Sequence, residues 1–176
     1  SWLKVVSTHQ VAHLEFGSFD FVFDESSKFF DDVRSDLEQA RNEVMVENYQ
    51  DDDSERTKVS YTTDIQRFFN LFDDRKLALD IFTVVEDGRL DSKIKVEYRG
   101  LQYEYGKIQR DSMADRPEIK KLPAREAMIE FLVLLSLQQS DVIPVPKPYQ
   151  QQAKSIRGVA KTVFAPESRI EDVAEA

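Results

Sequence analysis

The sequence predicts an all-α fold, an irregular multi-helix bundle. Only five of its 176 residues are glycine, which favours helices over a turn-rich sheet protein. Apolar side chains recur at steps of three or four residues along several segments, and this is the spacing of one buried helix face. Hydrophobic residues make up 41% of the chain, enough for one domain with a substantial core.

The first helix is expected over Trp2–Phe16, with Gly17 as its C-terminal stop. Residues 18–24 then alternate polar with aromatic, as a strand would. Because a single short strand has no obvious partner, we expect an extended segment that lies across the helices instead. Its anchors, which are also candidate contacts for a protein partner, are Phe19, Phe21 and Phe23.

Five further helices follow from periodicity and capping residues, over residues 28–48, 64–72, 73–98, 101–113 and 124–138. Gly88 lies inside the third of these and costs about 1 kcal/mol there relative to alanine. Such a glycine often allows a close approach, here by another helix or a metal site. The helix over 124–138 is apolar around most of its circumference and should be central and buried.

The rest of the chain is polar. The acidic run 51–55 lacks the glycine and terminal glutamate of an EF-hand and is expected to be a solvated loop. Residues 1–140 are expected to form the helical domain. Residues 141–176 are predicted to be a proline-containing extended segment and a flexible polar tail, with one short helix over 150–159.

Composition excludes several classes of function. The formal net charge of −9 argues against a general nucleic-acid or anionic-membrane surface and fits a protein that binds other proteins. The chain has no cysteine, so disulfides and thiolate chemistry are excluded. Its longest apolar run, 131–135, is far shorter than the about 20 residues of a membrane span. We expect a cytoplasmic fragment of a longer protein.

The two histidines, His9 and His13, are the main candidates for chemistry. Four residues apart on a helix, they share one face and can bind one divalent metal, zinc first, as in the HExxH signature of zincins. Gln10 occupies the position of the general-base glutamate, and an amide cannot accept the proton of a metal-bound water. The pair therefore predicts metal binding rather than hydrolysis.

A two-histidine site needs a third ligand, commonly a carboxylate on a second helix. We expect Glu86 in this role, with Asp87 and Asp91 as alternatives or as residues behind the ligands. Arg89 could supply the cation that a buried carboxylate requires. The competing interpretation is an exposed acidic patch in which Arg89 pairs with Glu86 along the helix.

Two alternatives to a non-catalytic metal site remain open. The first is a metal-dependent hydrolase with His9, His13 and Glu86 as ligands and Glu15 as base. Glu15 lies two positions after His13, about 200° around the helix, so it points away from the pair. The second is a purely structural role in which the two histidines pack or hydrogen-bond in the core without a metal.

Three stretches carry a family resemblance: HQVAHLEFGSFDF from His9, FFNLFDDRKLALDIFTVVEDGRLDSKIKVEYRGL from Phe68, and RPEIKKLPAREAMIEFLVLLSL from Arg116. They resemble the region upstream of the von Willebrand factor A domain in nitric oxide reductase activation proteins (NorD-like), to which the Rubisco-activase adaptor CbbO is related. The likeness covers about residues 2–137. Its most specific parts are the HxxxH with the later Glu-Asp-x-Arg at 86–89, and the run 122–126.

The resemblance implies an accessory, chaperone-like role. Proteins of this family act as adaptors for MoxR-type AAA+ ATPases and activate or mature a client, often a metalloenzyme. The chain would then be a helical module with that ATPase and the client enzyme as partners. The family's Asp-x-Ser-x-Ser motif is absent, since residues 24–27 do not match it, so its metal-dependent adhesion site is expected outside this sequence.

Overall fold

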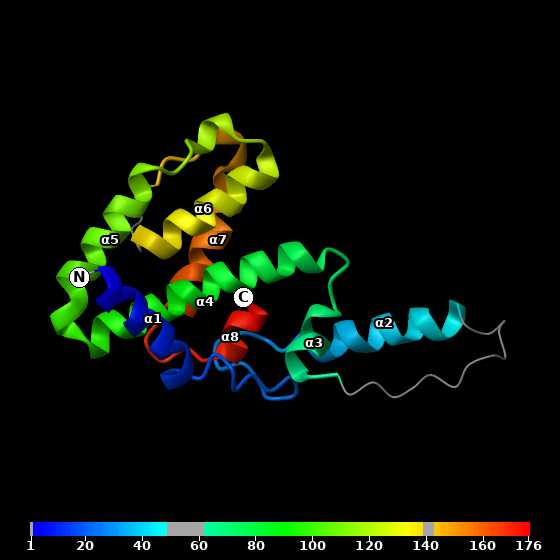
Figure 1. Cartoon of the computed structure of the whole chain (residues 1–176). Helices are drawn as coiled ribbons and strands as arrows, with labels where there is room; N and C mark the ends of the chain where they lie inside the picture. The colour runs from blue at the N-terminus through cyan, green and yellow to red at the C-terminus, as the bar shows by residue number, and fades with distance from the viewer. Residues whose placement is uncertain (1, 49–61, 139–142) are drawn as a thin grey trace.

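The structure is a computed structural model that describes residues 2–48, 62–138 and 143–176 (Figure 1). Within these ranges the chain forms α-helices and short 3₁₀ turns and no strand, which confirms the all-α class. The helices are α1 (Trp2–Glu15), α2 (Arg34–Asn48), α3 (Asp64–Phe69), α4 (Arg75–Glu97), α5 (Gln102–Ala114), α6 (Ala124–Gln138), α7 (Gln150–Val163) and α8 (Ile170–Glu175).

Helix α4 is the central element of the fold. It begins after Asp74, whose carboxylate accepts a hydrogen bond from the Leu77 amide at 3.0 Å, an N-cap of the kind expected from the sequence. Figure 1 shows α4 crossing the middle of the molecule, with α1 and α5 toward one end and α3 and α2 toward the other. Helices α1, α3, α6, α7 and α8 all contact it.

Among the residues whose burial the structure describes, the buried side chains form two clusters, and α4 contributes to both. The larger cluster gathers residues from α4, α6, α7, α8 and the segment before α2, with Phe23 and Phe131 fully buried at its centre. The smaller cluster joins α1 to α4 and α5 through Val5 and Ala12 of α1, Leu90 of α4 and Tyr105 of α5. Helix α1 buries only Val5 and Ala12, so little apolar packing holds it.

As expected, the segment after α1 is not a strand, but turns interrupt it, so it is not extended throughout. The Asp20 amide donates to the Gly17 carbonyl and the Glu25 amide to the Val22 carbonyl. Its three phenylalanines differ in environment. Phe21 and Phe23 are buried in the larger cluster, whereas Phe19 is 73% exposed. The prediction of all three as contacts for a partner is therefore wrong for Phe21 and Phe23, which belong to the core of the chain itself.

The helix expected from residue 28 begins only at Arg34. The backbone amides of Lys28 and Phe29 donate instead to the Asp172 carboxylate, at 2.6 and 3.0 Å, and the Phe30 amide donates to the Ser27 hydroxyl at 3.1 Å. These contacts fix a turn where helical periodicity predicted a first turn of helix. The acidic run 51–55 lies outside the described residues.

The predicted flexible tail is the clearest correction. Helix α7 runs to Val163 rather than ending at residue 159, and α8 follows it. Phe164, Ile170 and Val173 are buried in the larger cluster. The segment is polar in sequence because α8 carries acidic side chains. In the folded chain these side chains, Asp172 among them, bind residues that are distant in sequence and hold α8 in place.

Two other segments approach α4 closely at Gly88. A Cβ atom built on it would lie 2.5 Å from Cε1 of Phe164 and 3.1 Å from Cβ of Ser136 on α6. Both separations are shorter than ordinary carbon contacts of about 3.5–4.0 Å. The close approach expected from the sequence is confirmed, and the neighbours are a packed ring and a helix.

We therefore expect Gly88→Ala to destabilise the chain by about 1–3 kcal/mol through overpacking, although alanine is about 1 kcal/mol more favourable than glycine inside a helix. Gly158→Ala is the matched control, because Gly158 is exposed on α7 with nothing within 4 Å of its Cβ position. That variant should gain up to about 1 kcal/mol. Urea unfolding followed by circular dichroism measures both, and a Gly88→Ala variant as stable as the parent would contradict the close contact.

No helix in the described ranges is both long enough and apolar enough to span a bilayer.

Candidate metal centre

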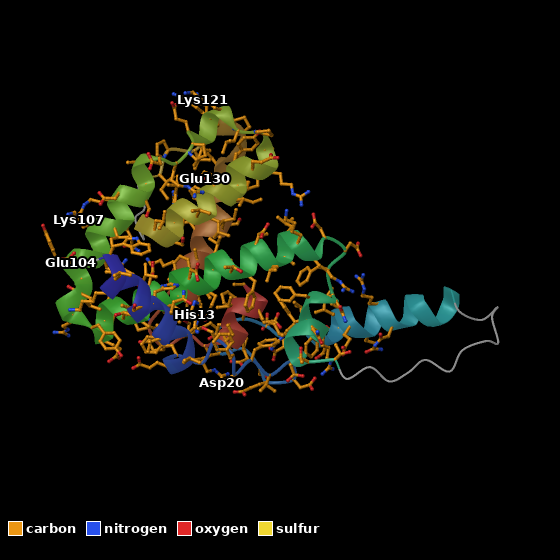
Figure 2. All side chains as sticks on the ribbon, in the orientation of Figure 1. His13, Asp20, Glu104, Lys107, Lys121 and Glu130 are labelled. Atoms are coloured by element: carbon orange, nitrogen blue, oxygen red, sulfur yellow. The ribbon has the colours of Figure 1, made fainter. Side chains whose placement is uncertain are left out.

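Both histidines lie on α1 and face α4. Figure 2 shows His13 near the end of α1, where this helix passes α4. The His9 and His13 rings lie 5.1 Å apart in an edge-to-face arrangement. Asp87 of α4 is the carboxylate between them, with Oδ1 3.3 Å from Nε2 of His9 and 3.9 Å from Nε2 of His13.

These separations fit a metal ion held by His9, His13 and Asp87. One possible ligand atom from each of the three residues lies within 4.8 Å of the others. Ligands about 2.0–2.1 Å from a tetrahedral zinc ion are about 3.4 Å from one another. The observed separations of 3.3 and 3.9 Å therefore require only small side-chain shifts to close around an ion.

The other ring nitrogen of His9 is held by two side chains. Nδ1 lies 3.1 Å from Oδ1 of Asp91 and 3.1 Å from the Tyr105 hydroxyl on α5. Asp91 in turn accepts a hydrogen bond from the Gln109 amide at 2.7 Å. A carboxylate behind a histidine orients the ring and presents its other nitrogen to a metal, so Asp91 supports the site rather than completing it.

The turn after α1 holds His13 in the same way. Gly17 has φ +73° and ends the helix, and the Ser18 amide donates to the His13 carbonyl at 2.9 Å. This turn places the Ser18 hydroxyl 3.0 Å from Nδ1 of His13. The hydroxyl also donates to Glu86. The Nε2 atoms of both histidines are therefore the nitrogens that face Asp87.

Glu86, the expected third ligand, is not part of the metal cluster. Its carboxylate is 3% exposed and accepts two hydrogen bonds from Arg89, from Nε at 2.7 Å and from Nη2 at 2.6 Å. The pairing of Glu86 with Arg89 along α4 is thus present, but in the interior rather than on an exposed patch. Asp87, one position further along α4, faces α1 and replaces Glu86 as the candidate ligand.

The charges of the two histidines differ in the metal-free protein. Hydrogen bonds to Asp87 and Asp91 raise the pKa of His9 to about 10, although burial opposes the shift. Burial and the neighbouring charge of His9 lower the pKa of His13. At neutral pH His9 is a cation paired with two aspartates and His13 is neutral. A metal ion bound here takes the place of the proton on His9.

Gln10 and Glu15, the residues weighed for the general-base position, are directed elsewhere, and so is Glu86. Gln10, in the position of the catalytic glutamate, is exposed on α1. Glu15 accepts a hydrogen bond from the Tyr98 hydroxyl at 2.5 Å. The Glu86 carboxylate is bound by Arg89. The arrangement therefore fits metal binding better than activation of a metal-bound water.

Three residues of the site were not expected from the sequence: Ser18, Tyr105 and Gln109. They have no spacing signal, because α5 and the turn after α1 approach α4 only in the folded chain. Asp87 did have one: Asp87 and Asp91 are four residues apart, like the two histidines, and two such pairs can face each other across neighbouring helices.

Comparison of the chain with family models, curated proteins and solved structures finds no match.

Proposed function

We propose that this chain is a non-catalytic helical module that binds one divalent metal ion, zinc before others, through His9, His13 and Asp87. The observation that carries the proposal is the convergence of these three donors while the other nitrogen of each imidazole is held by a separate polar group. Two imidazoles and a carboxylate are a common ligand set for zinc.

The metal would join α1 to α4. The outer face of α1 is largely uncovered, with Trp2, Leu3 and Leu14 at least 60% exposed. Few apolar contacts therefore hold this helix, and a bound ion adds its binding free energy to the folded state. In this role the ion stabilises the docking of α1 and performs no reaction.

The experiment is elemental analysis of the purified protein together with a zinc titration by calorimetry. We expect about one zinc per chain, lost in His13→Ala and in Asp87→Asn because each removes a ligand. Asp91→Asn should weaken zinc binding by about 10–100-fold, since it removes the support behind His9. Asp20→Asn is the matched control, because Asp20 is exposed beside the same turn and, within the described part of the chain, belongs to no group of possible metal ligands.

Two outcomes would contradict the metal site. One is a protein that neither contains zinc nor binds it in the titration, which would leave the structural role of the two histidines. The other is binding that survives both His13→Ala and Asp87→Asn. Zinc-dependent cleavage of a protein substrate, abolished by His9→Ala, would support the alternative that the chain is a metal-dependent hydrolase.

We further propose that the module belongs to an accessory protein that works with a MoxR-type AAA+ ATPase to activate or mature a client enzyme. This part rests on the likeness of the three stretches to nitric oxide reductase activation proteins. The acidic composition and the exposed Phe19, whose ring lies 6.1 Å from that of His13, favour a protein-binding role. Failure of the full-length protein to bind either the ATPase or the client would contradict it.

A further inference from the structure

An apolar groove lies on the molecule away from the histidines. It has a volume of about 650 Å³. The first half of α4 contributes Ile81 and Phe82, α6 contributes Met128, and α7 contributes Ile156. Leu37 of α2 and Val33, which lies just before that helix, also line it. In the described ranges the chain leaves three large apolar residues of this groove open to solvent: Val33 is 49%, Leu37 48% and Ile81 37% exposed. Contiguous exposed apolar surface of this kind is typical of a binding site.

The polar groups of the groove do not suit a small ligand. Small-molecule sites place a few polar groups where the ligand can reach them. Here the buried Arg34 and Glu175 side chains pair with each other, with Nε and Oε1 2.5 Å apart. Asp73 and Asp74 lie at the rim, with 96% and 52% of their side chains exposed. An apolar trough between helices with polar groups at its edge suits the apolar face of a helix.

The charges decide which helix fits. Asp73 pairs with Arg41 and Asp74 with Arg125 at the surface, and such pairs contribute about 0–1 kcal/mol, so a basic partner can compete for these carboxylates. One oxygen of Asp74 also caps α4 through the Leu77 amide. The whole chain carries −9. A second copy would bring the same negative charge to the contact, and an anionic membrane would also be repelled. We propose that the groove binds the apolar face of a basic amphipathic helix of another protein.

The test uses a fluorescein-labelled peptide of about 18 residues with leucine along one helical face and lysine on the other. Fluorescence anisotropy should show saturable binding to the full chain. Ile81→Gln and Leu37→Gln should each weaken it by about tenfold, the effect of about 1.4 kcal/mol at an anchor position. Leu79→Gln is the matched control and should bind like the parent, because Leu79 is 49% exposed on α4 but does not line the groove.

A peptide with glutamate in place of lysine should bind about tenfold more weakly at low salt, with a smaller difference at high salt. Equal binding of the acidic or a scrambled basic peptide would overturn the proposal, as would no binding of the basic one. Binding unaffected by Ile81→Gln and Leu37→Gln would overturn it too. A dimer in sedimentation equilibrium that Ile81→Gln abolishes would instead assign the groove to a second copy. These readouts do not depend on zinc, so they are independent of the metal-site test.

Discussion

Replacing Arg89 with methionine is expected to destabilise the folded chain by about 3–5 kcal/mol, the usual cost of removing one partner from a buried ion pair. The Arg89 side chain is 1% exposed, and its guanidinium holds the buried carboxylate of Glu86. It also donates to the carbonyls of Phe16 at 3.1 Å and Ser168 at 3.3 Å. Without Arg89, the buried Glu86 carboxylate and two backbone carbonyls lose their hydrogen-bond donor.

A double variant separates the charge from the other contacts. In Glu86→Gln with Arg89→Met, no carboxylate is left unpaired in the interior, so the loss should be smaller than in Arg89→Met alone. Both variants should be measured by urea unfolding in the presence of a chelator, because the Ser18 hydroxyl links Glu86 to His13 and a bound metal would add to the result. A loss below about 1 kcal/mol in Arg89→Met would show that this interior pair is dispensable.

Replacing Asp172 with asparagine is expected to cost about 3 kcal/mol, since hydrogen bonds to a charged group contribute about 1.5–3 kcal/mol and several are affected. Asp172 is fully buried. Its carboxylate accepts hydrogen bonds from the Ser27 hydroxyl at 2.7 Å, the Lys28 and Phe29 amides, and the Arg169 amide at 2.7 Å. An amide offers one acceptor and turns an NH₂ group toward donors.

The same carboxylate should make stability depend on pH. Burial raises the pKa of Asp172, but hydrogen bonds from the Arg169 amide, the Ser27 hydroxyl and the following amides outweigh burial and hold the pKa below its ordinary value. The carboxylate therefore stabilises the folded state fully above its unfolded pKa of about 3.9, and this contribution is lost as the pH falls through the lower folded pKa.

The measurement is the urea unfolding free energy between pH 7 and pH 3, for the parent chain and for Asp172→Asn. Other carboxylates titrate in both proteins, so the difference between the two curves reports Asp172. That difference should be constant near neutral pH and should shrink below about pH 4. Parallel curves down to pH 3 would show that the carboxylate has an ordinary pKa in the folded chain.

Local signals predicted most of the helices. Apolar periodicity located α4 and α6, and Asp74 and Gly17 marked a helix start and a helix end as capping rules predict. That residues 18–24 would not form a strand was also predicted, because an unpaired short strand is unfavourable, although turns interrupt the segment that was expected to be extended. These features depend on neighbours within a few residues along the chain.

The failures have a common physical cause, which is contact between residues distant in sequence. Helix α8 is short, and its acids bind the segment before α2, so its burial left no periodic pattern. The choice of Asp87 over Glu86 depends on the rotation of α4 about its axis. That rotation is set by the contact of Gly88 with Phe164 and by the carbonyls that Arg89 binds, and neither is visible along the sequence.

The position of the Arg89 guanidinium has a consequence for how the chain unfolds. One of its nitrogens reaches the carbonyl that follows α1, and another reaches the carbonyl shortly before α8. The first and last helices are therefore joined through one side chain of the central helix, although more than 140 positions separate them in sequence. If either terminal helix loosens, the Arg89 guanidinium loses a hydrogen bond that orients it, and the same guanidinium holds the other terminal helix. The two ends therefore belong to one cooperative unit.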